Sequence, residues 1–67
     1  MTTETVDRLR VTMQQMERLI RALDDLRENV LPKDPKLFAV LAEAPLDDLD
    51  RLRQEVHGYV DDLTPSA

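Results

Sequence analysis

His57 is the only histidine of the 67-residue chain and the first candidate for catalysis or metal binding. The chain contains no cysteine, and its only serine is Ser66 near the C-terminus. A Ser–His–Asp triad and a thiolate metal site are therefore excluded. We expect His57 to face solvent beside an apolar seam, and we expect no enzymatic activity.

Acidic residues are the second candidate group, and they form three clusters along the chain. The clusters are Asp24-Asp25, Asp47-Asp48 with Asp50, and Asp61-Asp62. Neighbouring helix positions point about 100° apart, so the two members of a doublet cannot chelate one ion together. The glycine-containing Asp-rich loop that binds calcium is absent as well. We therefore expect a solvated acidic surface that holds no metal ion and no other cofactor.

The charge balance restricts the partners. The chain has 14 acidic and 9 basic residues, and its net charge is -5 at pH 7, which argues against a nucleic-acid or anionic membrane partner. No apolar run approaches the length of a membrane span, and the start of the chain, from Met1 to Glu4, has no basic segment followed by an apolar run. These features predict a soluble, cytoplasmic protein.

The spacing of apolar residues predicts an all-α fold. Between Val6 and Val30 they recur in steps of three and four, which is a heptad seam that only Arg27 interrupts. The first helix is predicted at about 4–30, with Thr3 as its N-cap. It should end at about Asn29 to Leu31, because Pro32 disfavours a helical Leu31 and Asn29 tolerates a left-handed C-terminal conformation.

Prolines divide the second half of the chain. Asp34 followed by Pro35 is typical of a capped helix start. Pro45 predicts a break or a kink at Ala44–Pro45, so the second arm is expected as two segments at about 35–43 and 46–62. The linker is short, and short connections favour antiparallel neighbours. We predict an antiparallel helical hairpin with a proline-bent second arm, in a single domain 1–67 whose ends, 1–3 and 64–67, are frayed.

A hairpin of this size without a disulfide is seldom stable alone, so we predict a twofold homodimer that forms a four-helix bundle. The alternatives are a monomer with an exposed apolar edge, and a three-helix bundle in which residues 34–43 fold over one end. The residues expected in the core or the interface lie at or beside heptad positions of both arms: Leu9, Met13, Met16, Leu19, Ile20, Leu23, Leu26, Leu37, Phe38, Leu41, Leu49, Leu52, Val56 and Tyr59.

Two residues inside the expected helices need a separate explanation. Arg27 either sets the register or meets an acidic partner, or it pairs with Asp34 or Glu43 at the hairpin end. Gly58 either permits close approach of a helix or marks fraying. Antiparallel pairing is also expected to bring basic and acidic groups of the two arms together, namely Arg18 and Arg21 with Asp47, Asp48 and Asp50, and Arg8 and Arg10 with Asp61 and Asp62.

The sequence thus favours a non-enzymatic helical protein that acts through self-association and protein–protein interaction. The alternative is an acidic regulatory adaptor or inhibitor, of the antitoxin or sigma-antagonist kind, that becomes ordered when it binds a partner protein. A third hypothesis is a helical bundle that docks on RNA, because Arg8, Arg10, Arg18, Arg21 and Arg27 all lie on the first helix.

Overall fold

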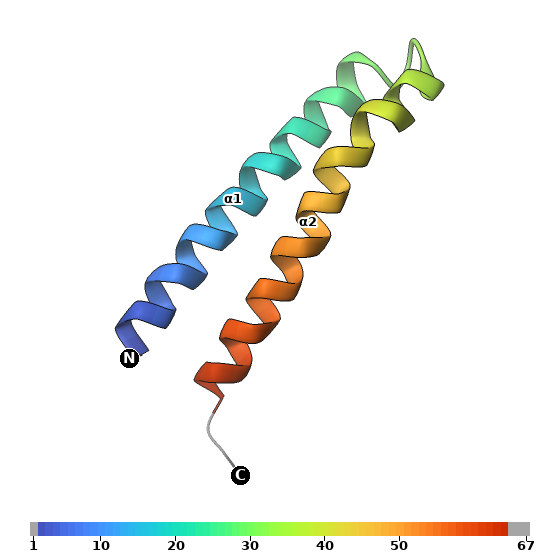
Figure 1. Ribbon diagram of the computed structural model, residues 1–67. Helices are drawn as coiled ribbons and strands as arrows, with labels where there is room; N and C mark the ends of the chain where they lie inside the picture. Colours follow the sequence, from blue (N-terminus) through green and yellow to red (C-terminus); the bar gives the residue numbers. More distant parts are fainter. Residues whose placement is uncertain (1, 65–67) are drawn as a thin grey trace.

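Two long helices make up the fold in the computed structural model, which describes residues 2–64. Helix α1 spans Thr2–Asn29, helix α2 spans Pro35–Leu63, and residues 2–64 contain no strand. The helices lie side by side and antiparallel, so that α1 begins where α2 ends (Figure 1). The predicted helical hairpin is confirmed.

The turn between the helices is short and closes with its own backbone hydrogen bonds. The amides of Lys33 and Asp34 donate to the carbonyl of Val30 at 3.0 and 2.8 Å. The Asp34 carboxylate then accepts from the amide of Leu37 at 3.1 Å, and Pro35 occupies the first helical position, where its missing N–H costs nothing. The predicted start of the second helix is therefore confirmed.

Loss of this cap should weaken the hairpin measurably. Asp34→Ala leaves an amide of the first turn of α2 without its partner, and we expect it to lower the free energy of unfolding by about 1 kcal/mol. Asp34→Asn keeps an accepting oxygen and should cost far less. Urea unfolding followed by circular dichroism compares the three proteins, and equal stability of all three would contradict the capping role.

Pro45 lies inside α2, which continues through it as one helix, so the predicted division of the second arm into segments 35–43 and 46–62 is wrong. Proline lacks the N–H that would donate to the carbonyl of Leu41, and its ring crowds that carbonyl, at a local cost of about 3 kcal/mol. Ala42 and Leu52, the two buried apolar residues of α2, lie on either side of Pro45. Their burial against α1 favours a continuous helix on both sides of Pro45.

The ends of the helices also differ from the expectation. Thr3 lies within α1 rather than capping it, and Asn29 ends α1 without a left-handed residue, since no non-glycine residue in 2–64 has a positive φ. At the other end of α2, the Thr64 hydroxyl donates to the carbonyl of Val60 at 2.8 Å. Met1 and residues 65–67, which belong to the ends expected to be frayed, lie outside the described residues.

Gly58 stands in open space on α2. A Cβ built at this position meets no atom within 4 Å, so the expected close helix approach does not occur between α1 and α2. Gly58→Ala should therefore stabilise the hairpin by about 0.5–1 kcal/mol, because alanine loses less backbone entropy in a helix. Thermal unfolding provides the measurement. A lower melting temperature for the alanine variant would mean that another surface approaches Gly58.

The hairpin is elongated and has a thin core. Its extents are 50 × 18 × 15 Å and its radius of gyration is 15.5 Å, against about 11 Å for a compact domain of this length. Among the described residues only Ala42 and Leu52 are buried apolar residues, and Thr12 is the one buried polar residue. Two packed helices alone therefore leave much of their apolar surface exposed to water.

Candidate interaction surface

The contact between the helices uses one heptad register on each helix. On α1 the inward-facing residues are half-buried or buried, and they are Thr5, Leu9, Thr12, Met16, Leu19, Leu23 and Leu26; Val30 of the turn is half-buried as well. On α2 they are Phe38, Ala42, Pro45, Leu49, Leu52, Val56, Tyr59 and Leu63. Ten of the fourteen predicted core or interface residues belong to these two sets. The structure thus brings together Leu9, Met16, Leu19, Leu23 and Leu26 with Phe38, Leu49, Leu52, Val56 and Tyr59.

The other four predicted residues are exposed in the single chain. Met13 and Ile20 on α1 are 49% and 54% exposed, and Leu37 and Leu41 on α2 are 44% and 43% exposed. In the predicted seam, Leu9, Met16 and Leu23 formed one apolar stripe together with Met13 and Ile20. In the structure the same three residues pair instead with the register of Leu19 and Leu26, so the remaining apolar register points outward.

Sequence reasoning missed Thr12 and Ala42 because neither is a large apolar residue. Thr12 is 6% exposed and borders a groove with Tyr59, whereas Ala42 is 2% exposed and lines a groove with Leu23 and Phe38. In both places a small side chain lies near a larger one from the opposite helix. The signal that points to Thr12 is its spacing, since Thr5, Thr12, Leu19 and Leu26 recur every seven residues.

One long side of the hairpin carries exposed apolar residues from both helices, and we name it the open face. Val6 and Met13 line one groove, Ile20 and Leu46 line another, and Val60 lies two heptads beyond Leu46 on α2. These five side chains are between 45% and 54% exposed. The open face therefore runs along most of the length of the hairpin.

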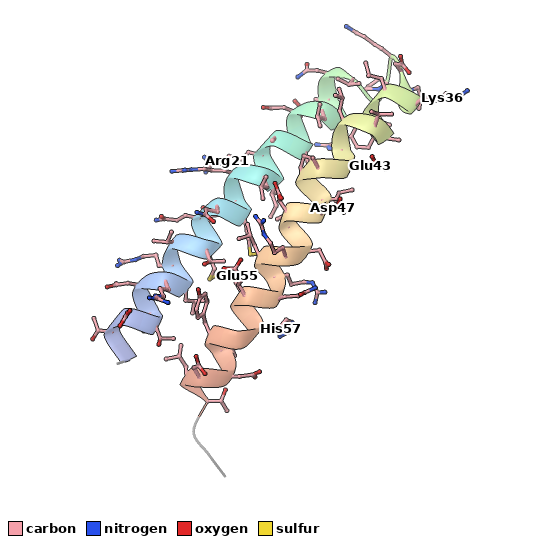
Figure 2. The ribbon with its side chains drawn as sticks, viewed as in Figure 1. Arg21, Lys36, Glu43, Asp47, Glu55 and His57 are labelled. Carbon is pink, nitrogen blue, oxygen red and sulfur yellow. The ribbon has the colours of Figure 1, made fainter. Side chains whose placement is uncertain are left out.

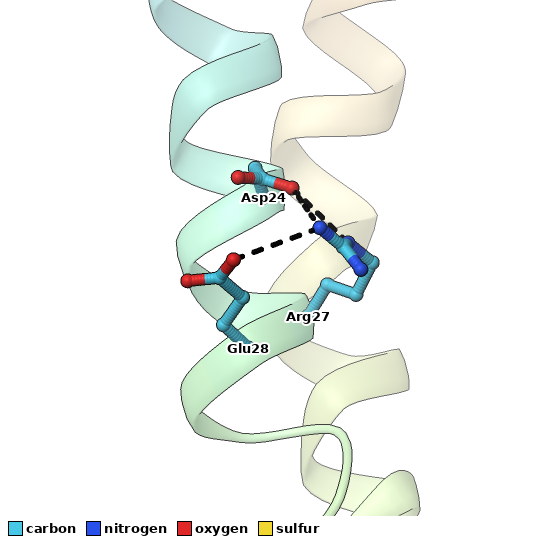
Figure 3. A network of polar contacts seen from close by, with 3 residues as sticks. All are labelled: Asp24, Arg27 and Glu28. Atoms are coloured by element: carbon cyan, nitrogen blue, oxygen red, sulfur yellow. Dashed lines mark hydrogen bonds and ion pairs between the residues drawn. The ribbon is translucent and has the colours of Figure 1, made fainter.

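Arg27 continues the register of Val6, Met13 and Ile20 at the turn end of the open face. Its guanidinium donates to Asp24 at 2.5 and 3.0 Å and lies 3.8 Å from a Glu28 carboxylate oxygen (Figure 3). The hydrogen bond and charge of Asp24, and then the charge of Glu28, raise the pKa of Arg27. The expected pairing with Asp34 or Glu43 is wrong, because the partners of Arg27 lie on its own helix.

The ion pairs of the described chain join residues of the same helix, and the expected ion pairs between the helices are not formed in residues 2–64. Arg8 binds Glu4 at 2.9 Å and Arg10 binds Asp7 at 2.7 Å, both within α1. On α2, Arg53 binds Asp50 at 3.0 Å. Since these side chains are more than half exposed, each pair contributes little to stability.

The groups considered first for chemistry do not converge. His57 is exposed on α2, and it and Arg21 point away from the opposite helix (Figure 2). No group of three or more His, Cys, Asp or Glu side chains within the described part of the chain could hold a metal ion. In the same residues neither helix has a stretch apolar and long enough to cross a bilayer. The open face, by contrast, gathers five exposed apolar residues along one side of the hairpin.

Comparison of the chain with models of known families, with curated proteins and with solved structures gave no match.

Proposed function

We propose that this chain functions by self-association, with two copies joined through their open faces into a four-helix bundle that acts in protein–protein interaction rather than catalysis. The observation that carries the proposal is the row of half-exposed apolar side chains along that face. The total accessible surface of the single chain, polar and apolar together, is 5414 Å², about 1,100 Å² more than the roughly 4,300 Å² expected for a compact protein of its mass. A standard interface covers about 800 Å² on each partner, so one second copy accounts for most of the excess.

The register on the open face supports a second copy as the occupant. Val6, Met13 and Ile20 recur every seven residues, and Leu46 and Val60 are separated by two heptads. A matching pair of such stripes is what a bundle of two hairpins needs for knobs-into-holes contacts. The inner register of each hairpin and the outer register together then form one continuous four-helix core.

Two arginines indicate how the copies would be oriented. Arg27 follows Ile20 by one heptad on α1, and Arg53 lies one heptad from both Leu46 and Val60 on α2. In a parallel twofold pair, each of these arginines would lie beside the same arginine of the second copy, and the two like charges would repel each other. An antiparallel pair places each arginine at a different level of the bundle from the same arginine of the second copy, which avoids this repulsion, and we propose this orientation.

Cysteine accessibility tests which face is covered, and the absence of natural cysteines makes the experiment clean. Ile20→Cys on the open face and Val11→Cys outside it start from similar exposures of 54% and 51%. We expect alkylation of Cys at position 20 to be at least tenfold slower than at position 11 in concentrated protein, and the two rates to converge on dilution. Equal rates at every concentration would contradict the proposed interface.

The adaptor hypothesis differs in a measurable respect. A chain that becomes ordered only on binding another protein would have low helicity when pure, and its helicity would rise when the partner is added. The proposed dimer is instead strongly helical on its own, and its melting temperature rises with protein concentration. Circular dichroism of the pure protein at several concentrations separates the two functions.

A further inference from the structure

Charged residues border the open face on both of its long sides, and we name them the rim. On α1 the rim residues recur every seven positions and line the grooves of the open face; they are Arg10, Glu17 and Asp24. On α2 they also recur every seven positions, each three residues before Leu46, Arg53 or Val60; they are Glu43, Asp50 and His57. All six side chains are exposed, and Glu43 and His57 lie on the side of α2 away from α1 (Figure 2).

The rim is basic at one end of the hairpin and acidic at the other. Val11 shares a groove with Glu55, and Ile20 shares one with Leu46, which sets the levels of the two helices against each other. Counted from these levels to within about one residue, the rim has three levels: Arg10 with His57, Glu17 with Asp50, and Asp24 with Glu43. The basic level lies near the chain ends, and the acidic levels lie in the middle and toward the turn.

These charges favour an antiparallel dimer. In a parallel pair, the basic end of one copy lies beside the basic end of the other, and the acidic end beside the acidic end, so like charges repel at every level. In an antiparallel pair, the basic end of each copy lies beside the acidic end of the other. A twofold axis across the hairpins then places α1 on α1 and α2 on α2 of the second copy.

The position of this axis follows from the overlap of the two open faces. Overlap along the whole length requires an axis midway along the hairpin, between Met13 and Ile20 on α1 and between Leu46 and Arg53 on α2. Met13 then lies on Ile20 of the second copy. Arg53 lies on Leu46 of the second copy, which separates it from the other Arg53.

We propose that His57 forms an ion pair with Glu43 of the second copy, and that the dimer therefore binds more tightly as His57 becomes protonated. The twofold axis brings these two positions to the same level of the contact between the α2 helices, to within about one residue. Neither side chain forms an ion pair within residues 2–64 of its own chain. The inference rests on the proposed dimer, in which symmetry forms the pair twice.

The other rim charges of α2 do not compete for this pair. Asp50 lies beside the axis and faces the Asp50 of the second copy, and Arg53 at 3.0 Å offsets its charge. Lys36, one heptad before Glu43, lies level with the uncharged Thr64 of the second copy.

On the α1 edge, Arg10 lies level with Asp24 of the second copy, which adds attraction, although each already has a partner on its own helix. Glu17 lies beside the axis and faces the Glu17 of the second copy. Repulsion is thus confined to the centre of the antiparallel rim.

The dimer adds negative charge around His57. On its own helix, Arg53 and Asp61 lie one turn before and one turn after it and have opposite charges, and Arg10 of α1 is level with it on the far edge of the open face. The second copy brings Asp47 as well, one turn from the proposed carboxylate partner. Histidine gains its charge between about pH 8 and pH 5, whereas exposed carboxylates keep theirs. The dissociation constant should therefore fall as the pH falls through this range.

Sedimentation equilibrium of the full chain at about pH 8 and about pH 5.5, at equal ionic strength, tests the pairing. We expect the dissociation constant of the natural chain to be roughly three- to tenfold lower at the acidic pH, because two exposed ion pairs form. His57→Gln and Glu43→Gln should lose most of this difference. Glu55→Gln is the matched control: it removes the same charge from α2, but Glu55 borders the groove of Val11 outside the open face, so the difference should remain.

The outcomes separate this inference from the dimer itself. Monomers at both pH values would overturn the dimer and the pairing together. A dimer of equal affinity at both pH values would overturn the pairing alone, and so would a Glu43→Gln variant that keeps the pH difference as Glu55→Gln does.

A charge exchange tests the orientation. Glu43→Lys and His57→Glu each place like charges together in an antiparallel homodimer, whereas a mixed dimer of the two variants restores opposite charges. At about pH 6 we expect the mixed dimer to be roughly five- to tenfold tighter than either homodimer, measured by fluorescence-detected sedimentation of dye-labelled Glu43→Lys with unlabelled His57→Glu. In a parallel pair each variant alone would instead associate more tightly than the natural chain. That result, or no preference for the mixed dimer, would contradict the proposal.

Discussion

Ile20→Asp is expected to convert the protein from dimers to monomers while each hairpin stays folded. Ile20 is 54% exposed in the single chain, so the aspartate is solvated there and costs the hairpin little. In the proposed four-helix bundle the same position is covered, and an unpaired carboxylate in an apolar interface is strongly unfavourable. We expect a loss of roughly 3–4 kcal/mol of association free energy, which is a few hundred-fold in the dissociation constant.

The matched control for this variant is Val11→Asp on the same helix. Val11 is 51% exposed but borders a groove with Glu55 and Tyr59, outside the open face. The control should therefore keep the mass and the helicity of the natural chain. Sedimentation velocity measures both variants, and equal dissociation by Ile20→Asp and Val11→Asp would contradict the assignment of the interface to the open face.

Leu52→Ala is expected to destabilise the fold itself by about 2–5 kcal/mol. Leu52 is 5% exposed and is the larger of the two buried apolar residues, so its removal leaves a cavity at the centre of the contact between α1 and α2. A 67-residue chain has little stability to lose, and much of the variant should be unfolded at 25 °C.

Urea unfolding at a fixed protein concentration measures this loss, because the stability of a dimer depends on concentration. Val40→Ala is the control: Val40 is 65% exposed, and its truncation should change the midpoint only slightly. A Leu52→Ala variant as stable as the natural chain would mean that the contact between the helices at this level is not the core of the protein.

Local signals in the sequence predicted the hairpin well. Asp34 and Pro35 define a helix start by their own chemistry, and the short turn leaves antiparallel pairing as the simple arrangement. The prediction of two segments in the second arm failed because the local preference of Pro45 against a helix is opposed by the burial of Ala42 and Leu52 on either side of it. A balance between local strain and tertiary burial cannot be read from one residue type.

The choice of register on α1 was harder to predict. Two apolar stripes overlap there, and each has a defect, since Thr5 and Thr12 weaken one and Arg27 interrupts the other. The large apolar residues favour the stripe of Met13 and Ile20, yet α1 packs on α2 through the stripe with threonines. Side-chain size on the facing helix decides between them, and this information is not contained in the periodicity of α1 alone.

The ion pairs predicted between the two arms are wrong for the described residues. Opposite charges on the two arms suggested contacts across the hairpin, but Arg8, Arg10 and Arg53 each have an acid three or four residues away on their own helix. A local pair costs less side-chain entropy than one that depends on the alignment of two helices. Antiparallel pairing of the arms therefore rests on the turn and on apolar burial.

The mass of the protein in solution tests the central claim most directly. Sedimentation equilibrium of the purified chain over a wide concentration range should give twice the 7.7 kDa of one chain. The dimer should dissociate only on strong dilution, and the helicity or the melting temperature should fall over the same range of concentration. A mass of 7.7 kDa at every concentration, together with a cooperative melting transition that does not depend on concentration, would contradict the account.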